Sequence, residues 1–215
     1  MSNEAEQGII KLKSDIYCLT IIGEIEGHTV SSSNAKTTKY EHIIPKLAKI
    51  EEDNEIKGLL ILLNTIGGDV EAGLAISEMI ASLSKPSVSI VLGGGHSIGV
   101  PLAVSASYSF IVPSAAMTIH PVRTSGTVIG APQSFEYFNR MQRSITHFIT
   151  KHSNISDDKF EKLMFDTKNI SNDIGTLLYG QEAVKVGLIN EIGGVKEALS
   201  KLKFLIEENN KNKAK

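Results

Sequence analysis

Apolar runs alternate with helical repeats along this chain and predict its secondary structure. Short apolar runs bounded by glycine or polar residues predict strands at 16–22, 58–63, 88–92 and 108–112. Apolar residues at helical spacing predict helices at about 40–50, 74–83, 135–152, 157–165 and 181–186, and a last one from about Val195. The second and third strands are apolar at nearly every position, which is typical of strands buried on both faces. The pattern therefore predicts an α/β fold of repeated βαβ units.

The composition is that of one ordinary globular domain. The chain has 215 residues, of which 41% are hydrophobic and 21% charged, and its formal net charge is −2. This length is enough for one large core, and no linker divides it. We expect a disordered segment at 1–14, a single domain at 15–206 and a disordered tail at 207–215.

The same composition excludes several classes of function. No dense basic patch supports nucleic-acid binding, and no apolar run is long enough to span a membrane. The polar start of the chain lacks the apolar core of a signal peptide. A single cysteine, Cys18, cannot form an internal disulfide, which fits a reducing cytoplasm. No histidine spacing predicts a metal site and no phosphate-binding P-loop occurs, so we expect a cytoplasmic protein without cofactors.

The segment Gly95-His96-Ser97-Ile98-Gly99 carries the strongest chemical signal. It follows the buried strand at 88–92 and precedes an apolar stretch, which is the context of a sharp strand-to-helix turn that exposes a nucleophilic serine. Such a turn also presents the N–H of Ile98 where the oxyanion of an acyl-transfer intermediate would form. Ser97 is therefore the candidate nucleophile, although the motif alone also occurs by chance.

Together with two further segments, this motif resembles the ClpP family of serine peptidases, whose fold is shared with the crotonases. The residues that carry the resemblance are the glycine-pair turn Asn64–Gly68, the segment Ser97–Gly99 and the segment Ile119–Pro121. The opening and closing parts of the chain, Leu19–His28 and Glu182–Ile189, also look like that family. The resemblance covers about 16–192. It implies an α/β, ClpP/crotonase-like spiral of β-β-α and βαβ units with a protruding helical arm at 135–152.

The resemblance also implies a catalytic triad. Ser97 would be the nucleophile and His120 the base, while Gly68 and Ile98 would supply the N–H groups of the oxyanion hole. The third member is open between two aspartates. We favour Asp173 by its place before a glycine and the Glu182 helix, and Asp166 is the alternative.

The implied activity is that of a serine endopeptidase acting on unfolded or short polypeptides. The resemblance further implies a ring-shaped homo-oligomer, and it leaves an ATPase unfoldase partner open. The alternatives are a non-catalytic scaffold or regulator, an acyl-CoA enzyme of the crotonase type and an α/β-hydrolase esterase. Chain order disfavours the esterase, because its histidine would lie near the C-terminus, whereas the last histidine here is His152. Arg123 could bind a carboxylate or pair across a subunit contact, and we favour the contact.

Overall fold

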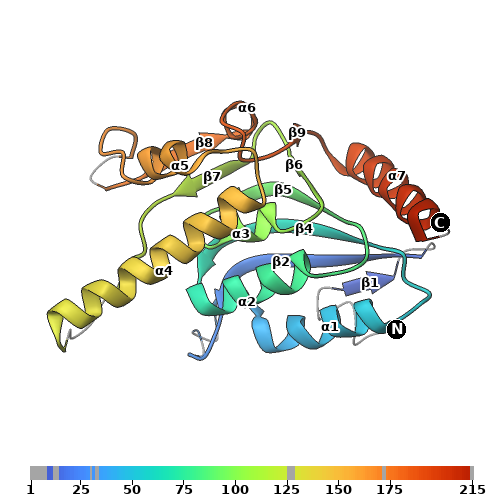
Figure 1. Cartoon of the computed structure of the whole chain (residues 1–215), viewed down its shortest axis with the longest axis horizontal. Helices are drawn as coiled ribbons and strands as arrows, with labels where there is room; N and C mark the ends of the chain where they lie inside the picture. The colour runs from blue at the N-terminus through green and yellow to red at the C-terminus, as the bar shows by residue number, and fades with distance from the viewer. Residues whose placement is uncertain are drawn as a thin grey trace.

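The computed structural model describes residues 9–11, 15–29, 31, 34–124, 129–170 and 173–213 (Figure 1). The strands are β1 (Ile9–Lys11), β2 (Ile16–Glu26), β3 (Thr37–Lys39), β4 (Gly58–Gly68), β5 (Ser87–Gly95), β6 (Tyr108–Ile111), β7 (Ala116–Ile119), β8 (Thr176–Tyr179) and β9 (Glu191–Ile192). The helices are α1 (Tyr40–Glu52), α2 (Val70–Ala81), α3 (Gly99–Val104), α4 (Ala131–Lys151), α5 (Asp157–Met164), α6 (Gly180–Lys185) and α7 (Val195–Lys213).

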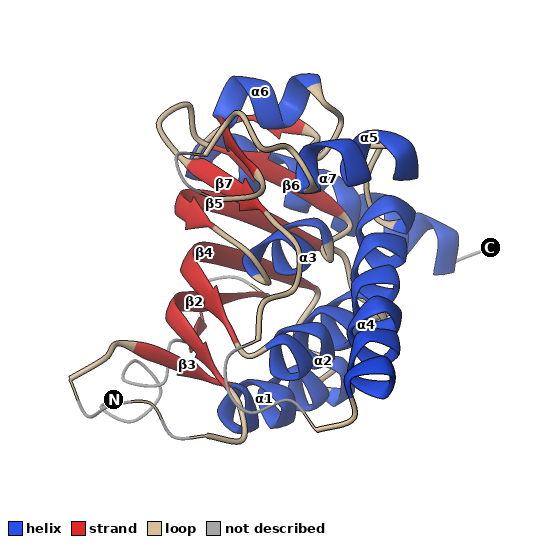
Figure 2. Ribbon diagram, turned by 90° about the vertical axis from the view of Figure 1, so that its left-hand side faces the viewer, coloured by secondary structure: helices blue, strands red, loops and turns tan. Residues whose placement is uncertain are grey.

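One mixed sheet organises these elements. Its hydrogen-bonded path runs β1-β2-β4-β5-β6-β9, while β3 pairs with β2 and β7 pairs with both β5 and β8. The pairs β2–β4, β4–β5, β5–β6 and β5–β7 are parallel, whereas β1–β2 and β7–β8 are antiparallel. Helices α1, α2 and α4 lie along one face of this sheet (Figure 2). This architecture confirms the predicted α/β fold.

The apolar runs of the central strands are buried on both faces of the sheet. In β4, Leu59 and Ile61 belong to a core cluster that includes residues of α1, α2 and α3. Leu60, which points to the opposite face, joins a second cluster with Leu202 and Ile206 of α7. Because each face of the strand meets a helix layer, every position of the strand core is apolar, as the sequence predicts for parallel strands.

The structure differs from the sequence-based boundaries at both ends of the chain. Ile9–Lys11, expected to be disordered, forms β1 on the open edge of β2, and 207–213 is the end of α7 rather than a disordered tail. The burial of Leu202 and Ile206 holds α7 on the sheet, which explains why the helix continues into the polar segment. The predictions for 1–8, 12–14, 214 and 215 lie outside the described residues. The single domain expected at 15–206 stays a prediction.

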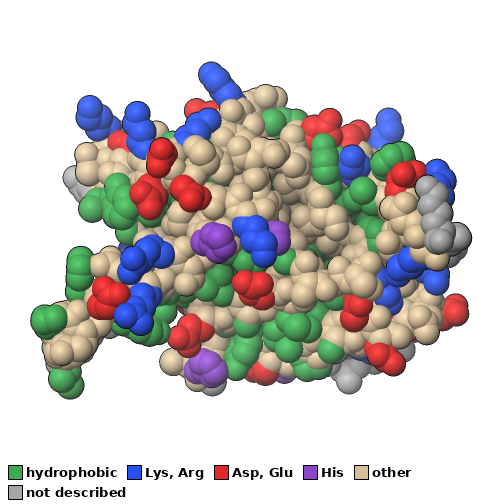
Figure 3. Space-filling model, viewed as in Figure 1, with side chains coloured by type: hydrophobic (Ala, Val, Ile, Leu, Met, Phe, Trp, Pro, Cys, Tyr) green, Lys and Arg blue, Asp and Glu red, His purple; other side chains and the backbone are tan. Residues whose placement is uncertain are grey.

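Helix α4 is the protruding arm that the sequence predicts (Figure 1). Its C-terminal half is packed, with Ile145, Phe148 and Ile149 buried. Its N-terminal half is exposed, and Phe135 retains 70% of its accessible surface. Hydrophobic side chains gather at the free end of this arm (Figure 3). Within the described ranges, no helix is both long enough and apolar enough to cross a membrane.

Candidate active site

Three parallel strands bring the candidate residues to one edge of the sheet. Strands β4 and β5 are parallel neighbours, and β5 continues into a parallel contact with β7 at Gly94 and Ala116. The carboxyl ends of parallel strands meet at the same edge, where ligands of α/β proteins usually bind. The glycine pair at the end of β4, Ser97 after β5 and His120 after β7 therefore converge.

Ser97 occupies the sharp turn between β5 and α3. Its φ of 57° lies in the left-handed region, and Ser97 is the one non-glycine residue with positive φ among those the structure describes. Hydrogen bonds hold the turn on both sides, from Ser97 N–H to the Thr118 carbonyl at 2.9 Å and from His96 N–H to the Thr65 carbonyl at 3.2 Å. The strained conformation is thus fixed by the neighbouring strands β4 and β7, as expected for an exposed nucleophile.

The glycine pair allows the end of β4 to approach this turn. A Cβ atom at Gly67 would lie 2.7 Å from Ser97 Cβ, and one at Gly68 would lie 2.3 Å from the Ile25 carbonyl oxygen. Both residues also have positive φ, at 94° and 146°. Only glycine fits these two positions without displacing the backbone.

His120 is placed by the pairing of β7 with β8. The register of these strands sets Ile119 opposite Thr176, so the segment before β8 lies against His120. A Cβ atom at Gly175 would be 2.9 Å from His120 Cβ, and Gly175 N–H donates to the Asp166 carbonyl at 2.7 Å. This packing carries Asp173 to the same region.

Two hollows meet at Ser97, His120 and Arg123, which line both of them. The first is a cavity of about 150 Å³ whose wall includes Gly68 and Ile98. The rest of its wall is mostly apolar and is formed by Val70, Val100, Ile119, Pro121, Val122, Gln142, Ile145, Ile149, Phe160 and Met164. The second hollow measures about 440 Å³ and its wall adds Ile66, His96, Thr118, Asn169, Ile170, Asp173 and Leu177. Asp166, the alternative third member, lines neither hollow.

His120 is half-buried and hydrogen-bonded to its own chain. Its Nδ1 lies 2.7 Å from the Pro121 carbonyl oxygen, which accepts a hydrogen bond from Nδ1–H and leaves Nε2 as the basic nitrogen. Burial lowers the pKa of His120, and the nearby Arg123 cation lowers it as well; the Pro121 hydrogen bond and the Asp173 carboxylate act in the opposite direction. The imidazole is therefore neutral near pH 7, as a general base must be.

Asp173 is paired with Arg123 and makes no hydrogen bond to His120 within the described residues. Its Oδ2 pairs with Arg123 Nη2 at 2.7 Å, and its Oδ1 accepts the N–H of Ile174 at 2.8 Å. Arg123 thus pairs with a carboxylate of its own chain. No hydrogen bond from Ser97 Oγ to His120 is present within the part of the chain that the structure describes.

Two further polar side chains shape the site. His96 lines the second hollow, and its Nδ1 lies 2.8 Å from Thr118 Oγ1. Gln142, which the sequence reasoning missed, lies in the wall of the first cavity, and its Oε1 accepts the N–H of Val122 at 2.7 Å. The sequence signal that could have identified Gln142 is its position as a polar residue beside the apolar stripe of the arm helix. Over the described ranges, no three His, Cys, Asp or Glu residues are grouped to hold a metal ion.

The sheet, the converging strand ends and the helical arm define an α/β protein with the fold of the Clp peptidases. The sequence model described as Clp protease matches residues 16–196. The chain therefore belongs to the Clp protease family, which confirms the resemblance deduced from its motifs.

Two relatives show the branch. The chain is 59% identical over 196 residues to the translocation-enhancing protein TepA of Halalkalibacterium halodurans, covering 91% of this chain and 77% of that protein. It is 28% identical over 153 residues to the ATP-dependent Clp protease proteolytic subunit 1 of Protochlamydia amoebophila, covering 70% and 72% of the two chains. Within the family, the chain is thus TepA-like.

The environment of His120 predicts its protonation. Burial disfavours the imidazolium, so we expect NMR signals of the His120 ring, assigned with the His120→Gln variant, to titrate below the ordinary value of 6.5. His96, whose pKa burial also lowers, is the comparison within the same spectra. A midpoint above 6.5 would mean that the Pro121 hydrogen bond and the attraction by Asp173 together outweigh burial and Arg123.

Proposed function

We propose that this chain is a serine endopeptidase that hydrolyses unfolded or short polypeptides. Ser97 attacks the peptide carbonyl, His120 takes the hydroxyl proton and later donates it to the leaving amine, and the N–H groups of Gly68 and Ile98 stabilise the oxyanion. Asp173 is the proposed partner of the His120 Nδ1–H. No cofactor takes part in this mechanism.

The left-handed turn at Ser97 is the observation that carries this proposal. A non-glycine residue in this region of φ/ψ space costs energy, and such strain is kept where the surrounding structure enforces it. Here the turn directs a serine into the junction of two hollows that His120 also lines. Membership of the Clp protease family supports the same chemistry.

The first cavity supports a preference for an apolar substrate side chain next to the cleaved bond. Its wall is mostly apolar and includes Val70, Ile145 and Phe160 from α2, α4 and α5. Burial of an apolar side chain there removes its surface from water, while the backbone N–H groups fix the carbonyl. A peptide bound in this way places its scissile carbonyl beside Ser97.

Assembly and partners are also part of the proposal. The exposed apolar end of α4 supports a ring-shaped homo-oligomer in which this arm packs against other subunits. The name of the Protochlamydia relative describes the proteolytic subunit of an ATP-dependent protease, and that likeness supports delivery of substrates by an ATPase.

A non-catalytic scaffold is the second candidate. The observation that favours it is the pairing of Asp173 with Arg123, which leaves His120 oriented by a carbonyl instead of a carboxylate. A scaffold would keep the fold and the assembly without an activated serine.

The first test is the loss of chemistry in Ser97→Ala. We expect this variant to lose fluorophosphonate labelling and peptide hydrolysis, with kcat lowered by about 10⁶, because the hydroxyl is the nucleophile. The exposed Ser82→Ala, at the end of α2, is the matched control and should label normally. Labelling of Ser97→Ala at another residue would disprove the assignment, and a wild-type protein that never labels would favour the scaffold.

The second test separates the two aspartates. We expect Asp173→Asn to lower kcat by up to ~10⁴, since an amide cannot stabilise the imidazolium, and Asp166→Asn to stay close to wild type. One fluorogenic peptide serves both variants, after light scattering has shown equal oligomeric mass. The reverse result would make Asp166 the third member, and two active variants would indicate a Ser-His dyad.

The third test concerns assembly through the arm. We expect light scattering at micromolar concentration to give a closed oligomer, and Phe135→Glu to shift it to smaller species, because a charge replaces an exposed apolar contact. Glu161→Gln, on the exposed side of α5, is the control. A monomeric wild-type protein would contradict the proposed ring.

A further inference from the structure

Arg123 occupies a special position in the site, because it lines both hollows that meet at Ser97. The other charged side chain in their walls is Asp173, and the histidines there have pKa values lowered by burial. Half of the Arg123 side chain is exposed, at 52%. A substrate in either hollow therefore meets a guanidinium group that can donate two parallel hydrogen bonds to a carboxylate.

The Arg123–Asp173 pair is open to competition. The Asp173 side chain is 39% exposed, so the pair faces solvent and is weakly held compared with a buried one. The pair joins Nη2 to Oδ2 at 2.7 Å, while the second carboxylate oxygen of Asp173 accepts the backbone N–H of Ile174. An incoming carboxylate that accepts two parallel hydrogen bonds from the Arg123 fork can replace this contact.

Displaced from Arg123, Asp173 has in His120 a partner of suitable chemistry that lines the same hollow. His120 Nδ1–H is bonded to the uncharged carbonyl of Pro121, and a carboxylate accepts that proton more strongly than a carbonyl does. The charge of Asp173 already acts on His120 in the observed conformation. The same aspartate can therefore neutralise Arg123 or orient His120.

We propose that Arg123 is a specificity residue that binds a carboxylate of the substrate in exchange for Asp173, which is thereby released to orient His120. The substrate class is a peptide with an acidic residue next to the apolar residue that fills the first cavity. The inference rests on the proposed function and adds to it a selection for acidic peptides and a resting state in which His120 lacks its carboxylate partner.

Binding tests the recognition without catalysis. In the Ser97→Ala background, we compare two short fluorescent peptides with one leucine flanked on both sides by glutamate or by glutamine. We expect the glutamate peptide to bind about fivefold more tightly, because a charge-assisted hydrogen bond to a half-exposed group contributes an effect of about this size. The formal net charge of −2 gives an acidic peptide no general advantage.

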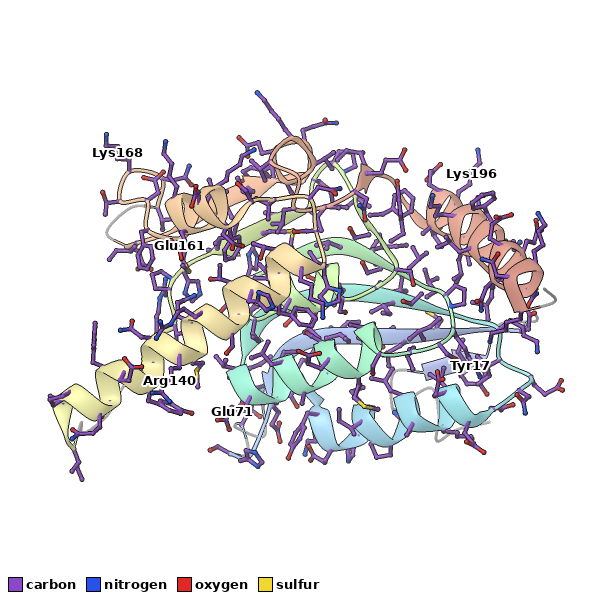
Figure 4. All side chains as sticks on the ribbon, in the orientation of Figure 1. Tyr17, Glu71, Arg140, Glu161, Lys168 and Lys196 are labelled. Atoms are coloured by element: carbon purple, nitrogen blue, oxygen red, sulfur yellow. The ribbon has the colours of Figure 1, made fainter. Side chains whose placement is uncertain are left out.

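Two variants locate the effect. The added Arg123→Gln should abolish the preference, whereas Arg140→Gln should keep it. Arg140 is the matched control because it carries the same charge on the exposed side of α4, paired with Glu136, and lines neither hollow (Figure 4). Equal binding of the two peptides, or a preference that survives Arg123→Gln, would overturn carboxylate recognition.

Turnover tests the release of Asp173. With Ser97 intact, we expect a higher kcat for the glutamate peptide, and we expect Arg123→Gln to raise kcat for the glutamine peptide, because Asp173 is then free without an acidic substrate. An unchanged or lower kcat for that peptide would overturn the release. Absence of fluorophosphonate labelling and of all cleavage would overturn the proposed function together with the release, while the binding experiment decides recognition separately.

Discussion

The hydrogen bond from Ser97 N–H to the Thr118 carbonyl is the contact on which the candidate site depends. It fastens the strained turn after β5 to β7, the strand that ends directly before His120. The parallel neighbours β4 and β5 supply the other side of the turn through the His96–Thr65 bond. A positive φ at a serine is costly, and here two adjacent strands hold it in place. The position of Ser97 is thus a property of the sheet rather than of a loop.

Close backbone packing is the second constraint. At Gly67 and Gly175, a Cβ atom would lie within 3 Å of Ser97 or His120 side-chain carbons, so each candidate catalytic residue has a glycine directly against it. These contacts leave little freedom for the backbone around the site. The wall of the first cavity combines residues of these strand ends and turns, such as Ile119 and Val122, with residues of α4 and α5, such as Ile145 and Phe160. The candidate catalytic residues and the apolar cavity therefore share one part of the fold.

Most polar side chains in the walls of the two hollows are uncharged near neutral pH. Burial favours the neutral form of both histidines, which leaves Arg123 and Asp173 as the opposed charges in the second hollow. Asp173 can pair with either of two residues. Pairing with Arg123 fixes the position of the carboxylate, whereas pairing with His120 would stabilise the imidazolium form of the histidine. In our proposal, this competition makes the protonation chemistry of His120 dependent on what else reaches Arg123. In the structure of this TepA-like chain, Ser97 and His120 line the same two hollows, while Asp173 is paired with Arg123.

The sequence by itself determined the α/β class, the apolar central strands, the arm helix and the positions of Ser97, Ile98 and the glycine pair, because these depend on local periodicity and on turn residues. The resemblance of three short motifs added His120 and the family. The tertiary structure alone decided what Asp173 contacts, since residues 123 and 173 meet only through the β7–β8 pairing. It also decided that β1 adds to the sheet and that α7 continues to Lys213, because an open strand edge and a buried helix face are features of the folded chain. Contacts between distant segments leave no local pattern, which is why the sequence could name the candidates for the third member but not show their partners.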